Sequence, residues 1–312
     1  MEEIEMREMR EMMNLWSFVG YIKENIKDYL PKEFKSATVQ VSEVVKNNDR
    51  ILCGMSILKP EQNISPTLYL EKWYEGYLRG KSLESILKEI AGIRIDADIP
   101  EKFDIRQIMD FENCKDKIYP RIINRNLNEK MLKNKPYKTL EDLAIIYFIK
   151  IGDLTDGAAT MMINDELMKN WNITEDELHS VALQNEQNVQ YSVRSMSSVL
   201  KSIGNDMSLG DIENVLNDII PFFIVTNENG INGSAVLLNT DYLKMIESKI
   251  GKFYILPSSV HEIIVLPESE VNDAEYLKEM VKDVNDSVVE EDEILSYNVY
   301  QFTAKNGLEI AK

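Results

Sequence analysis

The sequence predicts an α+β protein, in which helices and antiparallel or mixed sheets occupy separate stretches of the chain. Three observations support this fold class. Apolar residues recur at helical spacing in several windows, short β-branched runs lie between these windows, and Asn-rich turns join neighbouring runs without a helix between them. Over 312 residues, a hydrophobic fraction of 44% is sufficient for a substantial core. We expect two closely packed lobes, or one continuous domain.

The sequence pattern of residues 1–100 predicts an N-terminal α+β lobe with a small antiparallel sheet. The turn-forming sequence Asn47-Asn48-Asp49 separates two strand-like runs and so predicts a hairpin. Pro66 places the third strand at an edge, because proline cannot donate a ladder hydrogen bond. In chain order, the expected elements are a helix over 2–30, strands over 38–45, 51–58 and 64–70, and helices over 71–79 and from Ser82 onward.

Residues 101–138 predict a basic bridge of helices and turns. The stretch from Lys115 to Lys138 contains eight basic and two acidic residues. Lys117, Arg121 and Arg125 are four residues apart, which would place the three cations on one helix face. We interpret them either as a solvated face or as a contact for a phosphate or an acidic partner.

Residues 139–312 predict a larger C-terminal α+β lobe. Thr174-x-x-Glu177 is a capping box that begins a helix, and Asn229-Gly230 predicts a hairpin turn. The other expected helices are 164–171, one from Ser208 to Pro221, 240–251 and an acidic one from Asn272. The expected strands are 143–151, 158–163, 222–226, 235–238, 253–256, 263–266 and 297–302.

The stretch FYILPSSVHEIIVLP (253–267) holds the candidate catalytic residues Ser258, Ser259, His261 and Glu262. His261 is one of only two histidines, and it could act as a base for Ser258 or Ser259, with a carboxylate to orient it. In the simpler interpretation, the serines form a turn whose hydroxyls bond the local backbone. The chain has no GxxxxGK[ST], GxGxxG, HExxH or GxSxG sequence, which disfavours the enzyme classes that these motifs mark.

A second candidate surface is aromatic. Trp73 and Tyr77 are four residues apart, so one helix face could bind a peptide or a ligand ring. Packing of both rings into the core is the alternative.

Composition limits the partners. The net charge of −18 makes nucleic-acid binding unfavourable, although a local contact through the basic 115–138 segment stays open. No apolar run reaches the roughly 18 residues that span a bilayer. The acidic N-terminal stretch does not resemble a secretory signal, and two isolated cysteines do not form a disulfide framework. We expect a cytoplasmic protein with no metal, no cofactor and no membrane contact.

Three segments carry a resemblance to a known family. NISPTLYLEKWYEGYLRGKSLESILKEIA (63–91), TNENGINGSAVLL (226–238) and YILPSSVHEIIVLP (254–267) are similar to an uncharacterised domain-of-unknown-function family, number 5688, from anaerobic Gram-positive bacteria. The resemblance extends from about Tyr21 to Phe302. It implies a cytoplasmic bacterial protein without an assigned activity or assigned site residues.

Together these observations predict a protein- or peptide-binding module without catalysis. The alternative is a hydrolase or transferase that uses His261 with a nearby serine or carboxylate.

Overall fold

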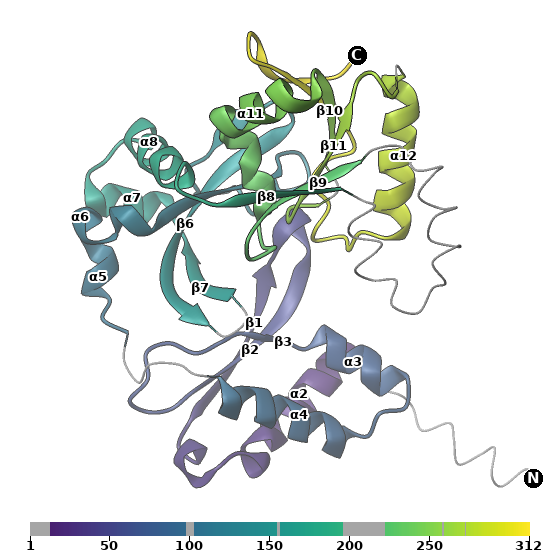
Figure 1. The fold of residues 1–312 in the computed structure, drawn as a ribbon. Helices are drawn as coiled ribbons and strands as arrows, with labels where there is room; N and C mark the ends of the chain where they lie inside the picture. The colour runs from purple at the N-terminus through teal and green to yellow at the C-terminus, as the bar shows by residue number, and fades with distance from the viewer. Residues whose placement is uncertain (1–12, 98–102, 155–156, 196–221, 258, 272) are drawn as a thin grey trace, which may run out of the picture. The chain divides into compact units, whose positions relative to one another are not determined.

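The structure is a computed structural model that describes residues 13–97, 103–154, 157–195, 222–257, 259–271 and 273–312 (Figure 1). The chain divides into two compact units. Unit 1 comprises Met1–Lys46 and Ile51–Ile105, and unit 2 comprises Asn47–Arg50 and Arg106–Lys312. Helices and antiparallel sheets confirm the α+β class. Among the described helices, none combines the length and apolar character needed to cross a membrane.

Unit 1 is built on a three-stranded antiparallel sheet of order β1-β2-β3. Thr38 pairs with Leu58 and Val45 with Ile51, which confirms the predicted hairpin. Strand β3 pairs only with β2, so the third strand is an edge as predicted, but it spans only Leu68–Tyr69 and Pro66 lies before it. The elements are α2 (Leu15–Asn25), two 3-10 turns (Ile26–Tyr29 and Lys32–Phe34), β1 (Thr38–Val45), β2 (Ile51–Leu58), β3 (Leu68–Tyr69), α3 (Glu71–Leu78) and α4 (Leu83–Asp96).

The helices of unit 1 form where the sequence provides caps and one apolar face. Asn14 caps α2 by accepting from the backbone N–H of Ser17, and Ser82 caps α4 in the same way. The apolar faces of both helices are buried in one core cluster with β2. The predicted helix over 2–30 is shorter in the structure: it ends at Asn25, and residues 1–12 lie outside the described part of the chain.

Unit 2 contains a six-stranded and a four-stranded antiparallel sheet. The first has the order β13-β12-β10-β11-β9-β8. In the second, β6 is central, with β4 on one edge and β5 and β7 on the other. The strands are β4 (Ile118–Asn124), β5 (Lys138–Leu140), β6 (Leu143–Leu154), β7 (Gly157–Met162), β8 (Tyr191–Ser195), β9 (Phe223–Asn227), β10 (Phe253–Leu256), β11 (Ile263–Pro267), β12 (Tyr300–Thr303) and β13 (Gly307–Ile310).

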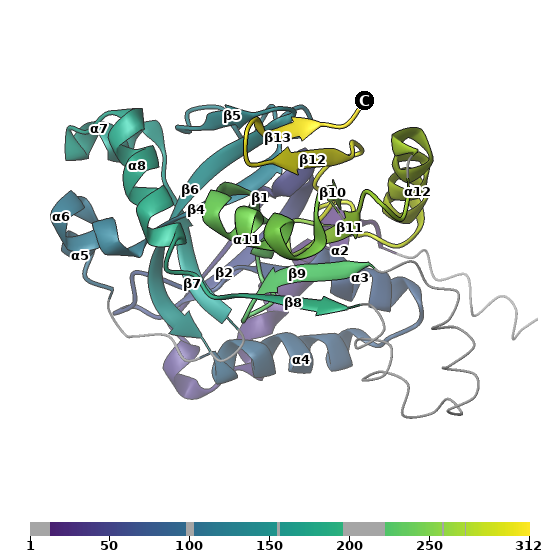
Figure 2. The same cartoon turned by 45° about the horizontal axis from the view of Figure 1, so that its top comes forward.

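The helices of unit 2 cover these sheets. Helix α8 packs against β4, and its start at Thr174 confirms the predicted capping box (Figure 2). The helices are α5 (Arg106–Met109), α6 (Phe111–Cys114), α7 (Asp165–Trp171), α8 (Glu175–Glu186), α11 (Thr240–Ile250) and α12 (Ala274–Ser287); 3-10 segments occur at Asn47–Asp49, Lys115–Lys117 and Gly233–Leu238.

Strand β10 is buried on both faces. Phe253 and Ile255 belong to the core cluster that includes residues of α11, whereas Tyr254 and Leu256 pack with residues of α12. Successive side chains of a strand point to opposite faces, so α11 and α12 cover opposite faces of the six-stranded sheet. This explains why FYIL is continuously apolar and does not alternate.

Several predicted elements differ from the structure. Residues 118–124 form β4, so the prediction of a helix that carries Arg121 is wrong. Residues 235–238 lie in the 3-10 segment Gly233–Leu238, so the predicted strand there is also wrong. The helix predicted from Ser208 lies outside the described residues. Strands β5, β8 and β13 were not predicted.

The turn Asn47–Arg50 is an integral part of unit 2. Asn48 and Asn128 exchange two hydrogen bonds, of 2.8 and 2.9 Å, and Asn48 Nδ2 also donates to the carbonyls of Glu291 and Ile294. Asp49 accepts from the backbone N–H groups of Lys130 and Met131. Both Asn48 and Asp49 have positive φ, a conformation that Asn and Asp tolerate better than most residues.

Candidate functional site

The candidate catalytic residues lie in the loop between β10 and β11. Because β11 begins at Ile263, the residues Ser259, His261 and Glu262 are in this loop and not on a strand. Ser259 is buried, and His261 and Glu262 are half-buried. Ser258 lies outside the described residues.

The hydrogen bonds of His261 fix its orientation. Its Nδ1 accepts from the backbone N–H of Asn232 at 3.2 Å, so the neutral imidazole carries its proton on Nε2. Nε2 lies 3.4 Å from the Glu293 carboxylate. The Ser259 hydroxyl oxygen accepts from the backbone N–H of His261 at 3.0 Å. The loop therefore pairs His261 with Glu293, and Ser259 with the local backbone.

The segment 226–234 packs directly against this loop. The Thr226 hydroxyl and the Gly233 N–H both donate to the His261 carbonyl, at 2.8 and 2.9 Å. The Ser234 hydroxyl donates to the Val260 carbonyl at 2.7 Å. A Cβ at Gly233 would lie 2.5 Å from the His261 carbonyl oxygen, so only glycine allows this close approach.

The candidate basic residues lie in three different local structures. Lys117 is exposed in a 3-10 turn, Arg121 is in β4, and Arg125 follows that strand. The Arg121 guanidinium stacks 3.7 Å above the Phe148 ring and donates to the Thr160 hydroxyl at 2.9 Å. Burial lowers the pKa of Arg121 to about 10. Its contacts make Arg121 a packing residue of the four-stranded sheet.

The candidate aromatic residues of α3 pack against the core of unit 1. The Tyr77 ring lies 5.6 Å from the Phe18 ring, and its hydroxyl oxygen accepts from the backbone N–H of Met13 at 3.2 Å. Trp73 is half-buried beside the same cluster.

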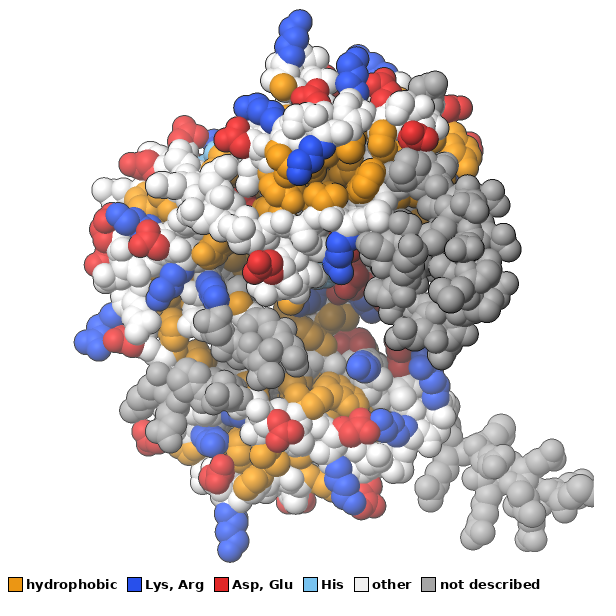
Figure 3. Space-filling view, viewed as in Figure 1, with side chains coloured by type: hydrophobic (Ala, Val, Ile, Leu, Met, Phe, Trp, Pro, Cys, Tyr) orange, Lys and Arg blue, Asp and Glu red, His pale blue; other side chains and the backbone are white. Residues whose placement is uncertain are grey.

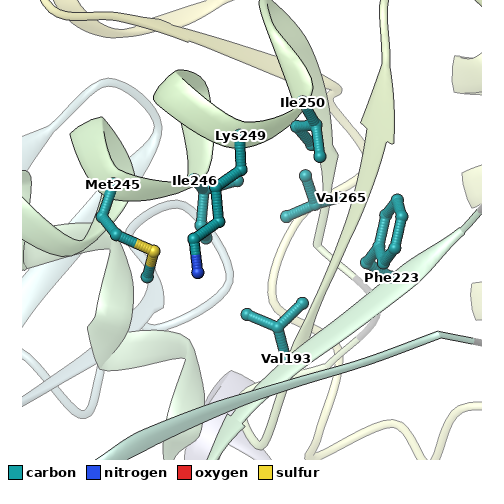
Figure 4. A pocket seen from close by; sticks show the side chains of 7 residues that line it. All are labelled: Val193, Phe223, Met245, Ile246, Lys249, Ile250 and Val265. Atoms are coloured by element: carbon teal, nitrogen blue, oxygen red, sulfur yellow. The ribbon is translucent and has the colours of Figure 1, made fainter.

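The structure also presents an apolar groove that the sequence did not reveal. It has a volume of about 210 Å³ and lies between one side of α11 and strands β8, β9 and β11 (Figure 4). We call it the β8–α11 groove. Its lining residues are Val193, Phe223, Met245, Ile246, Lys249, Ile250 and Val265.

Helix α11 is amphipathic, and residues beside its buried face line this groove. Its Leu243 and Ile246 side chains are buried in the core of unit 2. Met245 and Lys249 lie four residues apart at the side of that face, and Lys249 reaches from the helix toward Val193 (Figure 4). Among the described residues that line the groove, Lys249 alone is charged.

Strand β8 contributes Val193 to the lining of the groove. In the described sheet, β8 has β9 as its single neighbour, so its outer edge pairs with no described strand. Val193 is 42% exposed there. Figure 3 shows hydrophobic side chains gathered on the face that this part of unit 2 presents. An apolar edge strand of this kind favours pairing with another extended segment.

A buried acid anchors the first residue of β8. The Tyr191 hydroxyl donates to Glu186 Oε1 at the end of α8, and the Tyr191 ring lies 5.4 Å from the Tyr242 ring of α11. Glu186 is 2% exposed, and burial raises its pKa to about 7, while the bond from Tyr191 lowers it. These contacts hold the start of β8 beside α11.

Sequence comparison identifies a family and no further relatives. The chain matches the "Family of unknown function (DUF5688)" over residues 15–304. No curated protein and no solved structure matches it. The match covers most of the chain, and the protein therefore belongs to this family of unknown function.

Proposed function

We propose that this protein binds an extended peptide segment of a partner protein at the outer edge of β8, without catalysing a reaction. The observation that carries the proposal is the outer edge of β8, which pairs with no described strand, beside the β8–α11 groove. A peptide that adds to a sheet edge gains main-chain hydrogen bonds, and alternate side chains of the added strand enter neighbouring pockets.

The size of the groove favours a peptide over a larger ligand. Pockets for drug-sized molecules measure about 300–1,000 Å³, whereas this groove measures about 210 Å³. That volume suits one or two apolar side chains. Burying one such side chain contributes about 1.5–3 kcal/mol, so a useful affinity also requires the backbone pairing along β8.

The test is selection of short random peptides on the full-length protein, followed by titration of the enriched peptides. We expect enriched sequences with apolar residues at alternate positions. Val193→Asp places a charge in the groove and abolishes their binding. The matched control is Val288→Asp, because Val288 is 76% exposed and does not line the groove. Absence of enrichment, or equal binding to the Val193→Asp variant, contradicts the proposal.

One observation favours a second candidate, a hydrolase or transferase centred on His261. Its imidazole is partly exposed and lies beside Glu293, a pairing that orients a general base in many enzymes. However, Ser259 donates no described hydrogen bond to the imidazole, and Nδ1 is occupied by Asn232. Loss of a measured hydrolytic or transfer activity in a folded His261→Ala variant would establish this function in place of the first.

A further inference from the structure

We infer that the bound peptide carries an acidic side chain two positions from the apolar residue that fills the groove, and that Lys249 recognises it. This inference rests on the proposed function and adds the chemistry of the partner.

Lys249 has an exposed ammonium group at the rim of the groove, and no described carboxylate pairs with it. The neighbouring lysine on α11 differs: Lys244 pairs with Asp241 at 3.2 Å. The chain has 53 acidic residues against 35 basic ones, so potential partners are abundant. Lys249 therefore combines an apolar surrounding with the lack of a described carboxylate partner.

The strand itself adds a second cation. Arg194 is exposed on β8, next to Val193, and the described part of the chain offers it no carboxylate partner. Adjacent side chains of a strand point to opposite faces, so Arg194 lies on the face away from α11. An added strand therefore meets one cation on each face of the sheet. These two described cations are complementary to an acidic segment.

Strand geometry sets the spacing. Side chains two positions apart on a strand share a face and are roughly 6.6 Å apart. When one apolar side chain enters the groove between Val193 and α11, the side chain two positions away lies on the same face as Lys249. A carboxylate there can accept a charge-assisted hydrogen bond from the ammonium group.

The test repeats the peptide selection on variants of Lys249 and compares the enriched peptides with those that wild type selects. We expect Asp or Glu to be enriched two positions from the apolar residue, and replacing that acid by its amide to weaken binding about tenfold. Lys249→Met removes this discrimination, and Lys249→Glu selects Lys or Arg at the same position. The matched control, Lys252→Glu, makes the same change in net charge on an exposed residue that does not line the groove. It leaves the acidic preference intact.

The outcomes separate the two claims. Peptides that bind through Val193 with no acidic preference overturn the role of Lys249 and leave the proposed function standing. Failure to enrich any peptide overturns the proposed function itself. Binding of decanoate that Lys249→Met abolishes, without peptide enrichment, would instead assign the groove to a small amphipathic carboxylate.

Discussion

Glu186 makes the stability of the protein depend on pH. Its carboxyl group is buried at the end of α8 and its pKa is raised from 4.5 to about 7. The folded protein therefore holds this proton more tightly than the unfolded chain does. Stability falls with rising pH wherever the folded state binds more protons. The contribution of Glu186 is complete below about pH 4.5, declines between pH 4.5 and 7, and is lost above pH 7.

The magnitude follows from the two pKa values. At about 1.36 kcal/mol per pH unit, a rise from 4.5 to about 7 corresponds to roughly 3 kcal/mol. Glu186→Gln keeps the shape of the neutral carboxyl group and an oxygen that accepts from Tyr191, but it cannot ionise. We therefore expect wild type to lose roughly 3 kcal/mol of unfolding free energy relative to this variant between pH 4.5 and 8.

Urea unfolding at a series of pH values measures this difference. The control is Glu129→Gln, which removes one exposed carboxylate and leaves the buried one in place. Tyr191→Phe adds a second check: because the bond from Tyr191 lowers the pKa of Glu186, its loss moves the decline to higher pH. Parallel pH profiles for wild type and Glu186→Gln would refute the reasoning.

Four further substitutions have defined outcomes in the same unfolding assay. Gly233→Ala lowers the free energy of unfolding by several kcal/mol, because the new methyl group would collide with the His261 backbone carbonyl. Its control is Gly20→Ala in helix α2, where the new Cβ meets no tertiary neighbour within 4 Å and raises the free energy of unfolding by about 1 kcal/mol. Equal effects of the two substitutions would contradict this prediction. Asn128→Ala breaks the amide pair with Asn48 and costs about 2–3 kcal/mol, so an unchanged midpoint would argue against the pair. Arg121→Met keeps the packing of the side chain and changes stability by less than about 1 kcal/mol, since no described carboxylate pairs with Arg121; a larger loss would assign its charge a structural role.

Short sequence patterns predicted the helix caps, turns and strands whose residues lie close together in the sequence. The capping box at Thr174 is satisfied by backbone and side-chain groups within three residues, so the local sequence contains its whole cause. The turn at Asn47-Asn48-Asp49 was also predicted from its residue types, although its side chains bond to groups far along the chain. Strands β10 and β11 were also predicted, because their two apolar runs flank a turn-forming segment.

The wrong prediction of a helix around Arg121 also has a physical reason. A spacing of four residues fits a helical face, but it also fits one face of a strand, because four is a multiple of two. The spacing of Lys117, Arg121 and Arg125 therefore could not distinguish the two. The isoleucines at 118, 122 and 123 favour a strand, and they were the available signal.

The β8–α11 groove could not be predicted from local sequence. Val193 and Lys249 lie on separate elements far apart in the chain, and the groove arises only when the sheet aligns β8 with β9 and α11 covers its face. The sequence of β8 offers only a short alternation, in which Tyr191 and Val193 alternate with Ser192 and Arg194.

The discontinuity of unit 2 has a consequence for the order in which the chain can fold during synthesis. Asn47 donates to the carbonyl of Asp292, 245 residues further along the chain. At about 5–20 residues per second, the ribosome makes the second partner roughly 12–50 s after the first. The turn Asn47–Arg50 must remain available for that time, so unit 2 cannot be completed before its C-terminal part is translated. A fragment that begins at Arg106 would lack the turn altogether and leave the Asn128 amide without Asn48.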